Sequence, residues 1–545
     1  MSEVLWRPSD ARVAGSHLAR FMQAAPGSPE DYQQLWSWSV EDLAGFWAQV
    51  WDDAEVVASR RYAQVLDEPR MPGAKWFAEA RLNHAENLLR RRDDDVALIG
   101  AGEGRDDERV TWAQLHGLVG HAQQGLRDLG VGPGDRVAAV VPNCVEAVVV
   151  MLAATALGAV WSSCSPDFGA MGVVDRFGQI RPKVLLVADG YRYAGRTHPL
   201  ADKVAAVVDA LDELDHVVVV DFVGVGLTIP GRQVLGYAQL LDNDATAVDF
   251  VQLPPDHPLF ILYSSGTTGV PKSIVHGHGG TLLTHLKEHR LHVDLHAGRD
   301  TIFWFTTCGW MMWNWLVSAL ATGAAVVVYD GSPTHPGPEA LWRLADRAGV
   351  THFGTSPKFL AACAGAGLRP ADFADLSQLR SLLSTGSPLH PDQFDWVYDA
   401  VASDVQLASV SGGTDLIGCF AGGVPTLPVR RGELQGRMLA MAVEAWDLDG
   451  KPVVGQKGEL VCTRPFPSMP TGFWDDPDGA RYRTAYFDAN PGVWTHGDYI
   501  ELTPHGGVVI HGRSDTTLNP GGVRIGTAEI YRAIEPLPEV ADAVV

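Results

Sequence analysis

Cysteine is scarce in this 545-residue sequence, and no two cysteines stand close together. The six are Cys144, Cys164, Cys308, Cys363, Cys419 and Cys462. The low count excludes a disulfide scaffold, and the absence of any Cys-x-x-Cys spacing excludes a zinc ribbon. Scattered cysteines are typical of proteins from a reducing compartment, so we expect a cytoplasmic location.

The sequence also lacks a hydrophobic run long enough for a membrane helix. Its longest charge-free apolar run, Ala147–Trp161, has 15 residues, whereas a membrane span needs about 20. Residues 1–15 contain no apolar segment of the kind found in a signal peptide. We therefore expect no membrane partner.

Basic residues are in deficit, with 42 Lys and Arg against 65 Asp and Glu and a net charge of −23. Such a balance repels the phosphate backbone of nucleic acids, so nucleic acid is excluded as a main partner. A local basic pocket for a small anion remains compatible with it. A composition of 46% hydrophobic and 20% charged residues excludes a wholly disordered or fibrous chain.

Alternating helical and strand patterns are present from about residue 110. Helical spacing at 112–129 is followed by apolar strands at 136–141, 184–188 and 217–220, which predicts parallel sheets with crossover helices. From about residue 432, shorter strands with Gly and Pro turns predict a β-rich unit. The fold class predicted is α/β: a large N-terminal domain of parallel or mixed sheets with flanking helices, a small β-rich subdomain, and the start of a small C-terminal α+β domain.

The predicted segments have approximate boundaries. Residues 1–90 form a helical, tryptophan-rich layer of the large domain, 91–431 the α/β sheets with the functional sites, 432–514 the β-rich subdomain, and 515–545 a hinge and the beginning of a C-terminal domain. Because the last residues, 539–545, resemble an opening strand, we expect the C-terminal domain to continue beyond Val545.

The strongest functional signal is a loop that follows the apolar strand Leu259–Tyr263. Residues 264–272 read SSGTTGVPK, so small residues expose backbone N–H groups and hydroxyls, and Lys272 adds positive charge. Loops of this kind bind phosphate oxygens. It is not the Walker loop, in which a glycine precedes the lysine, because Pro271 stands there.

This loop resembles the phosphate loop of the adenylate-forming superfamily of acyl-CoA synthetases, adenylation domains and luciferases. Four further segments agree in the same order: STGSP at 384–388, SGGTD at 411–415, WTHGD at 494–498, and 512–530. Further segments resemble the acetyl-CoA synthetase branch and, within it, the acetoacetyl-CoA synthetases most: WRPS at 6–9, 32–47, LNHAENLL at 82–89, SPDFG at 165–169 and GWMMWNW at 309–315. The resemblance covers essentially the whole chain.

The resemblance implies an AMP-forming acid–thiol ligase that uses ATP, CoA and Mg²⁺. In that family a carboxylate attacks the α-phosphate of ATP to give an acyl-adenylate and pyrophosphate, and CoA then displaces AMP. The implied ATP-binding residues are Ser264, Ser265, Gly266, Thr267, Thr268, Gly269, Lys272, Gly386, Ser387, Pro388, Ser411, Gly413, Thr414, Asp498 and Arg513. The implied catalytic residues are Thr414, Asp415 and Arg524, with Asp415 also holding Mg²⁺ and Asp515 acting as the hinge.

The acyl pocket is implied to include Trp310, Met311, Thr385 and Gly412. At Gly412 the acetate-specific relatives carry a tryptophan that closes the pocket, so its absence predicts a longer acid, acetoacetate. Butyrate or another short- or medium-chain acid is the alternative substrate. Gly412 can equally serve a tight turn. A 3-oxo group needs a donor, for which Asn314, Ser411 and Trp310 are candidates.

Residues that match the CoA-binding positions of the family are Asp167, Phe168, Gly169, Arg192 and Arg196. The family also carries a lysine in its C-terminal domain that acts in adenylation and that this sequence does not include. A lysine acyltransferase or deacylase acting on that domain is a further possible partner.

Two hypotheses from other functional classes compete with the ligase hypothesis. His285, Glu288 and His289 match the H-x-x-E-H pattern of inverted zinc peptidases. Five-residue patterns arise readily in a chain with 19 histidines, so we expect an ordinary helix surface there. A non-catalytic nucleotide-binding protein is the other alternative.

Overall fold

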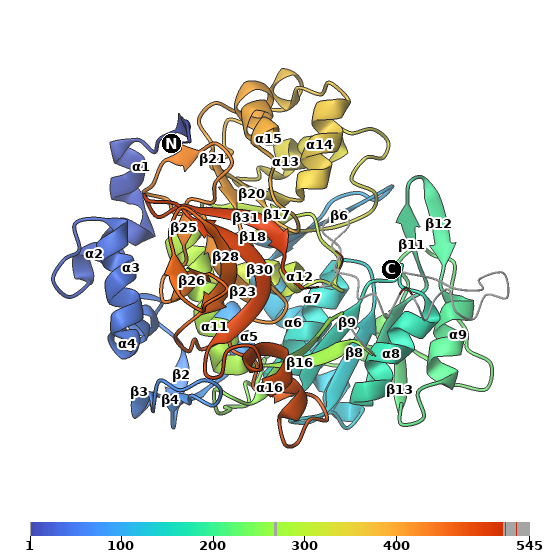
Figure 1. Ribbon diagram of the computed structural model, residues 1–545. Helices are drawn as coiled ribbons and strands as arrows, with labels where there is room; N and C mark the ends of the chain where they lie inside the picture. The colour runs from blue at the N-terminus through green and yellow to red at the C-terminus, as the bar shows by residue number, and fades with distance from the viewer. Residues whose placement is uncertain (1, 266–269, 516–517, 519–529, 531–545) are drawn as a thin grey trace, which may run out of the picture.

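Two large sheets form the body of the computed structural model, which describes residues 2–265, 270–515, 518 and 530 (Figure 1). The eight-stranded sheet has the order β14 (Leu235–Gly236), β13 (His216–Val220), β10 (Val184–Ala188), β8 (Arg136–Val140), β9 (Val160–Cys164), β15 (Pro258–Ser264), β16 (Lys272–Gly277) and β29 (Gly472–Phe473). The strands from β14 to β15 are parallel, whereas β15–β16 and β16–β29 pair antiparallel. The phosphate-loop segment therefore joins the two antiparallel strands β15 and β16.

The second large sheet has seven strands. Their order is β21 (Gln406–Ser409), β20 (Ser381–Ser384), β19 (His352–Thr355), β17 (Thr301–Trp304), β18 (Ala325–Asp330), β6 (Val96–Gly102) and β7 (Glu108–Thr111). All neighbours are parallel except β6 and β7. The predicted α/β fold with parallel and mixed sheets is confirmed.

Helices fill the space between the two sheets. In α7 (Val145–Ala156) every residue except Glu146 is buried, as expected for a helix that is apolar on all sides. This helix contacts β9 of one sheet and β6 of the other. Helices α5 (His84–Leu88), α6 (Trp112–Asp128), α11 (His278–Lys287) and α12 (Met311–Ser318) surround it or continue the same layer.

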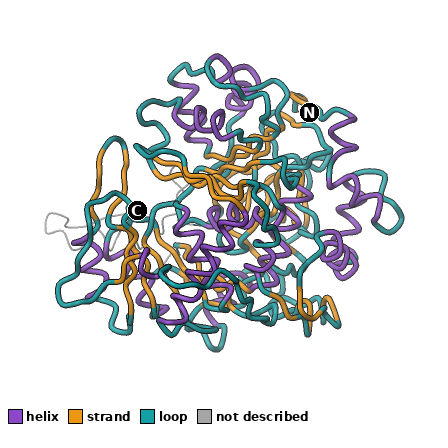
Figure 2. The backbone as a smooth tube through the Cα atoms, turned by 180° about the vertical axis from the view of Figure 1, so that it is seen from behind, coloured by secondary structure: helices purple, strands orange, loops and turns teal. Residues whose placement is uncertain are grey.

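Further helices cover the outer faces (Figures 1 and 2). The seven-stranded sheet is covered by α13 (Ala340–Ala348), α14 (Pro357–Gly365) and α15 (Pro391–Trp396), and α8 (Ala170–Ile180) and α9 (Ala201–Asp209) lie by the eight-stranded sheet. The N-terminal layer consists of α1 (Asp10–Gly15), α2 (His17–Ala24), α3 (Tyr32–Glu41) and α4 (Leu43–Asp53), with short strands β2 (Ala58–Arg60), β3 (Gln64–Leu66), β4 (Trp76–Ala78) and β5 (Arg81–Leu82). Its Trp47 and Trp51 are buried in the main core.

Two small antiparallel sheets follow the second large sheet. One has the order β27 (Pro452–Val453), β26 (Val443–Trp446), β28 (Lys457–Cys462), β30 (Trp494–Leu502) and β31 (Val508–Arg513), and the other β22 (Ser411–Gly413), β23 (Gly418–Gly422) and β25 (Gly436–Arg437). The helix α16 (Ala480–Phe487) packs on β30. The predicted division of the chain at residues 90, 431 and 514 stays a prediction.

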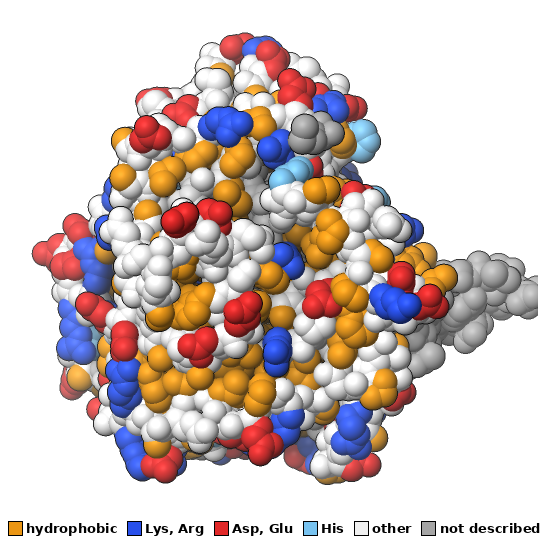
Figure 3. Space-filling model, turned by 60° about the vertical axis from the view of Figure 1, so that its left-hand side comes forward, with side chains coloured by type: hydrophobic (Ala, Val, Ile, Leu, Met, Phe, Trp, Pro, Cys, Tyr) orange, Lys and Arg blue, Asp and Glu red, His pale blue; other side chains and the backbone are white. Residues whose placement is uncertain are grey.

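The surface carries both signs of charge. On the face shown in Figure 3, basic side chains are interspersed with acidic ones and with hydrophobic side chains. Among the described residues, no helix combines the length and the apolar character that crossing a bilayer requires.

Candidate active site

A cavity of about 410 Å³ lies at the carboxyl ends of the seven-stranded sheet, where these strands meet the two small sheets. This edge of a parallel sheet is the usual position for ligands. The predicted site residues that line the cavity are Trp310, Met311, Thr385, Gly386, Ser387, Pro388, Ser411, Gly412, Gly413, Thr414, Asp498 and Arg513. The fold thus brings together residues that are spread over about two hundred positions.

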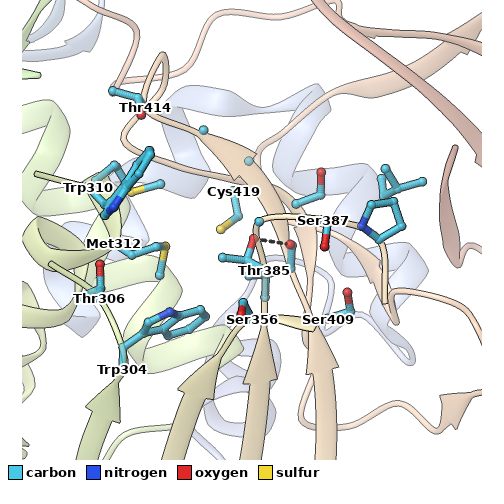
Figure 4. Close-up of a pocket in the computed structure, with 18 of the residues that line it drawn as sticks. Trp304, Thr306, Trp310, Met312, Ser356, Thr385, Ser387, Ser409, Thr414 and Cys419 are labelled. Carbon is cyan, nitrogen blue, oxygen red and sulfur yellow. Dashed lines mark hydrogen bonds between the residues drawn. The ribbon is translucent and has the colours of Figure 1, made fainter. Parts of the chain in front are cut away.

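The cavity has an apolar flank and a polar flank (Figure 4). Trp304, Trp310 and Met312 lie on one flank, Ser387 and Ser409 lie on the other, and Cys419 lies between them. The hydroxyl of Thr385 donates to the carbonyl of Val410 at 2.7 Å, which ties the STGSP segment to the segment before β22.

Several lining residues were not predicted from the sequence. They are Trp304, Phe305, Thr306, Thr307, Met312, Thr355, Ser356, Ser409, Val410, Cys419, His496, Ile510 and Gly512. Most adjoin a predicted motif or end a parallel strand, so strand ends were the signal that could have found them. The Oγ1 atoms of Thr307 and Thr355 are buried without a hydrogen-bond partner among the described residues, which marks them as groups that a ligand could satisfy.

The predicted ATP-binding residues Asp498 and Arg513 lie on β30 and β31. Asp498 Oδ1 accepts a hydrogen bond from Arg513 Nη1 at 3.1 Å, and His496 Nε2 lies 3.5 Å from Asp498 Oδ2. Arg513 also pairs with the predicted hinge residue Asp515. A carboxylate held in this way presents acceptor oxygens at the cavity wall, as hydroxyl groups of a ligand require.

The predicted ATP-binding residues Ser264 and Lys272 lie on β15 and β16, and they are not among the residues that line the cavity. Lys272 Nζ lies 3.2 Å from Asp415 Oδ1, and the Asp415 side chain is buried and also accepts from the Tyr486 hydroxyl. The buried Oγ of Ser264 has no partner among the described residues. A buried carboxylate, a lysine and a spare hydroxyl fit a phosphate with its Mg²⁺. The predicted residues Gly266, Thr267, Thr268, Gly269 and Arg524 lie outside the described residues.

The backbone at Gly412 lies close to the neighbouring strand. A Cβ on Gly412 would lie 2.0 Å from the carbonyl oxygen of Gly418 and 2.6 Å from Cys419 Cα. Strands β22 and β23 therefore approach too closely here for any side chain, and a tryptophan would require their backbone to move. Gly412 also lines the cavity, and its part in admitting a longer acid stays a prediction.

The three candidate donors for a 3-oxo group separate in the structure. Trp310 and Ser411 line the cavity. Asn314 does not, although it is buried and its side-chain amide atoms have no partner among the described residues.

The residues predicted to bind CoA fall in two places. Phe168 adjoins Gly309, next to Trp310, because a Cβ on Gly309 would lie 3.6 Å from the Phe168 ring. Arg192 and Arg196 lie on the hairpin of β11 (Gly190–Tyr193) and β12 (Arg196–Pro199), where Arg192 lines a second cavity of about 390 Å³.

The H-x-x-E-H segment is not the helix surface that we expected. His285, Glu288 and His289 are all buried, at the junction of α11 and a π-helical turn, Glu288–His292. His285 Nε2 bonds to the carbonyl of Ile417 at 2.7 Å and His289 Nε2 to that of Trp315 at 2.8 Å. Burial lowers the pKa of both imidazoles to about 3, so they are neutral.

This arrangement does not support the zinc-peptidase alternative. In the described part of the chain, the side chains placed closely enough to share a metal are His17, Asp294 and His296. They do not include His285, Glu288 or His289, and guanidinium groups such as those of Arg20 and Arg380 lie beside them.

Comparisons with known proteins agree with the geometry. The family model described as AMP-binding enzyme matches residues 85–474, and the acetyl-coenzyme A synthetase N-terminus model matches 32–88. An acetoacetyl-coenzyme A synthetase of Rhizobium meliloti (strain 1021) is 50% identical over 554 residues, 99% of this chain and 84% of that protein. An acetoacetyl-CoA synthetase of Gallus gallus is 48% identical over 558 residues, 99% and 83% of the two chains.

A solved structure shares the fold. Acetoacetyl-CoA synthetase from Streptomyces lividans superposes with a TM-score of 0.90 at 48% identity, covering 100% of this chain and 85% of that one. The chain therefore belongs to the AMP-binding enzyme family and, within it, to the acetoacetyl-CoA synthetases.

Proposed function

We propose that the protein ligates acetoacetate to CoA in two steps that use ATP. The acid's carboxylate attacks the α-phosphorus of ATP and displaces pyrophosphate, which leaves an acyl-adenylate. The CoA thiolate then attacks the acyl carbonyl and displaces AMP. The observation that supports this proposal is a cavity lined both by the predicted acyl residues Trp310 and Met311 and by predicted nucleotide residues, among them Ser387, Pro388, Thr414, Asp498 and Arg513.

In the first step the protein positions two reactants and neutralises charge. Asp498 and Arg513 would orient the ribose, and Ser387 and Pro388 would lie against the adenine. Thr414 would contact the α-phosphate, while Lys272 and the serine hydroxyls at 264 and 265 would face the outer phosphates. Mg²⁺, when bound, supplies charge neutralisation for the phosphates, and Asp415 would hold it.

The acid would occupy the apolar flank. Trp304, Trp310 and Met312 provide a surface for a short carbon chain. The hydroxyl of Thr306 and the indole N–H of Trp310 supply donors for a 3-oxo group. A site built to donate a hydrogen bond discriminates more strongly than apolar contact alone, which separates acids by only about 10- to 200-fold per methylene.

In the second step CoA would approach past Phe168 and Gly169, with Arg192 and Arg196 facing its phosphates. Glu103 holds the hairpin that carries these arginines, because its carboxylate accepts from the backbone N–H groups of Ala194, Gly195 and Ser332. We infer a cytoplasmic location from the six free, buried thiols. Modification by a lysine acyltransferase or deacylase stays a prediction.

The test is acid-dependent ATP–pyrophosphate exchange by the full-length protein with Mg²⁺ and acetate, propionate, butyrate or acetoacetate. Exchange that is fastest with acetoacetate is the expected result. Fastest exchange with butyrate would keep the mechanism and change the acid. No exchange with any acid would contradict the proposed adenylation.

A further inference from the structure

The H-x-x-E-H segment forms hydrogen bonds with two elements that line the cavity, α12 and the β22–β23 hairpin. His289 bonds to the carbonyl of Trp315 in α12, the helix that carries Met311 and Met312. His285 bonds to the carbonyl of Ile417, in the turn between β22 and β23. A π-helical turn often marks a functional position, and here it carries Glu288 and His289, whereas His285 lies in α11 just before it.

Glu288 joins the two walls directly. Its Oε2 accepts from the indole Nε1 of Trp315 at 2.8 Å, and its Oε1 accepts from the backbone N–H of Cys419 at 3.0 Å. A carboxylate has two acceptor oxygens and can satisfy both donors at once, whereas a glutamine has one acceptor oxygen and one donor nitrogen. A glutamate side chain can therefore accept both hydrogen bonds here, whereas a glutamine side chain cannot.

Both partners of Glu288 lie at or next to the apolar flank of the cavity. Cys419 lines the cavity itself. Trp315 packs edge-on against Trp304, with ring centroids 5.6 Å apart, and Trp304 also lines the cavity (Figure 4). On its other side Trp304 rests on Gly354, where a Cβ would lie 2.1 Å from the indole ring. The Trp304 ring is thus held between Trp315 and the backbone of β19.

A buried counter-charge accompanies Glu288. Lys287 Nζ lies 3.7 Å from Glu288 Oε1, donates to the carbonyl of Leu439 at 3.3 Å and faces the ring of Trp47. The ammonium group of Lys287 balances the charge of the carboxylate in the core, where an isolated charge would strongly destabilise the fold.

We propose that Glu288 is a positioning residue that sets the separation of Trp304 and Cys419, and thereby the acid that the enzyme prefers. This inference rests on the proposed function. Glu288 touches no substrate; it acts through the indole of Trp315 and the backbone of β23.

Trp315→Phe tests the inference, since it removes the donor to Glu288 Oε2 and keeps most of the buried ring. Trp6→Phe is the matched control, because it also removes an indole N–H bond of 2.8 Å to a carboxylate, in that case to Asp404 Oδ1. Trp6 is buried like Trp315, lies on the N-terminal strand β1 (Val4–Trp6), and is not among the residues that line the cavity.

Acid-dependent ATP–pyrophosphate exchange gives kcat/KM for acetoacetate and for butyrate. We expect the ratio of the two to fall by about tenfold in Trp315→Phe, the lower end of what a methylene-sized change in a pocket produces, with an unchanged KM for ATP. Trp6→Phe should keep the ratio. An unchanged ratio in Trp315→Phe, or an equal fall in both variants, would overturn the inference about Glu288. Normal exchange by the unaltered protein would in that case still support the proposed ligase function. Absence of exchange in the unaltered protein would overturn both.

Discussion

Two lysine–carboxylate pairs lie at or beside the turn between β22 and β23, and they differ in their access to solvent. Lys272 and Asp415 are 3.2 Å apart, with side-chain exposures of 25% and 2%. Lys287 and Glu288 are 3.7 Å apart, with exposures of 0% and 1%. The first pair adjoins the predicted phosphate loop, and the second lies in the core behind the apolar flank of the cavity.

The difference indicates two uses of the same chemistry. A lysine that keeps access to solvent can exchange its carboxylate partner for an incoming phosphate at little cost. A sealed pair has no such alternative, and its carboxylate is also committed to Trp315 and Cys419. We therefore expect the open pair to serve the reaction and the sealed pair to serve the architecture on which selectivity depends.

The largest expected effect comes from breaking the sealed pair. Glu288→Gln leaves the ammonium of Lys287 buried without a counter-charge and should lower the free energy of unfolding by about 3–5 kcal/mol. Denaturation in urea measures this change. The double variant Lys287→Met/Glu288→Gln removes both charges and should recover much of the loss; a double variant no more stable than the single one would contradict the assignment of the cost to the unpaired lysine.

Breaking the open pair should affect the rate instead. Asp415→Asn should slow acid-dependent pyrophosphate exchange by about 10²- to 10³-fold, as for the loss of a charge-stabilising group, because it removes the charge that we propose holds Mg²⁺. The free energy of unfolding should change little, since Lys272 remains hydrated.

Asp135→Asn is the control for this second comparison. Asp135 and Lys183 form a pair 3.4 Å apart with exposures of 29% and 27%, at the amino end of β8 and therefore away from the cavity edge. If Asp135→Asn slowed exchange as much as Asp415→Asn, the loss would reflect general electrostatics and not a role of Asp415.

The contrast also explains what the sequence could predict. Motifs that follow strand ends, such as STGSP and SGGTD, placed Thr385 and Thr414 at the cavity, since the carboxyl ends of neighbouring parallel strands share one edge. The role of Glu288 depends on Trp315 and Cys419, which are 27 and 131 positions away. Local spacing carries no signal for such partners, so the polar H-x-x-E-H segment was expected at the surface.

Gly412 illustrates the same limit. A glycine in a motif indicates a missing side chain but not the reason for it. In the structure a Cβ at Gly412 would meet the carbonyl of Gly418 in the neighbouring strand, a contact that only the folded backbone reveals.

The smallest expected effect concerns the protons of the sealed region. Burial lowers the pKa of His285 from 6.5 to about 3, so in that pH window the unfolded chain binds a proton that the folded protein does not. The contribution of His285 therefore makes the free energy of unfolding rise with pH: this contribution is fully present above about pH 6.5 and is lost as the pH falls towards 3.

His285→Gln keeps a donor for the carbonyl of Ile417 but removes this titration. Between about pH 7 and pH 5.5, the variant should lose about 1 kcal/mol less of its unfolding free energy than the unaltered protein. Urea denaturation at both pH values measures the difference, with His390→Gln, at a position whose side chain is 72% exposed, as the control. An equal loss in His285→Gln and in the unaltered protein would mean that water reaches the His285 imidazole, and that the region around Glu288 is not sealed.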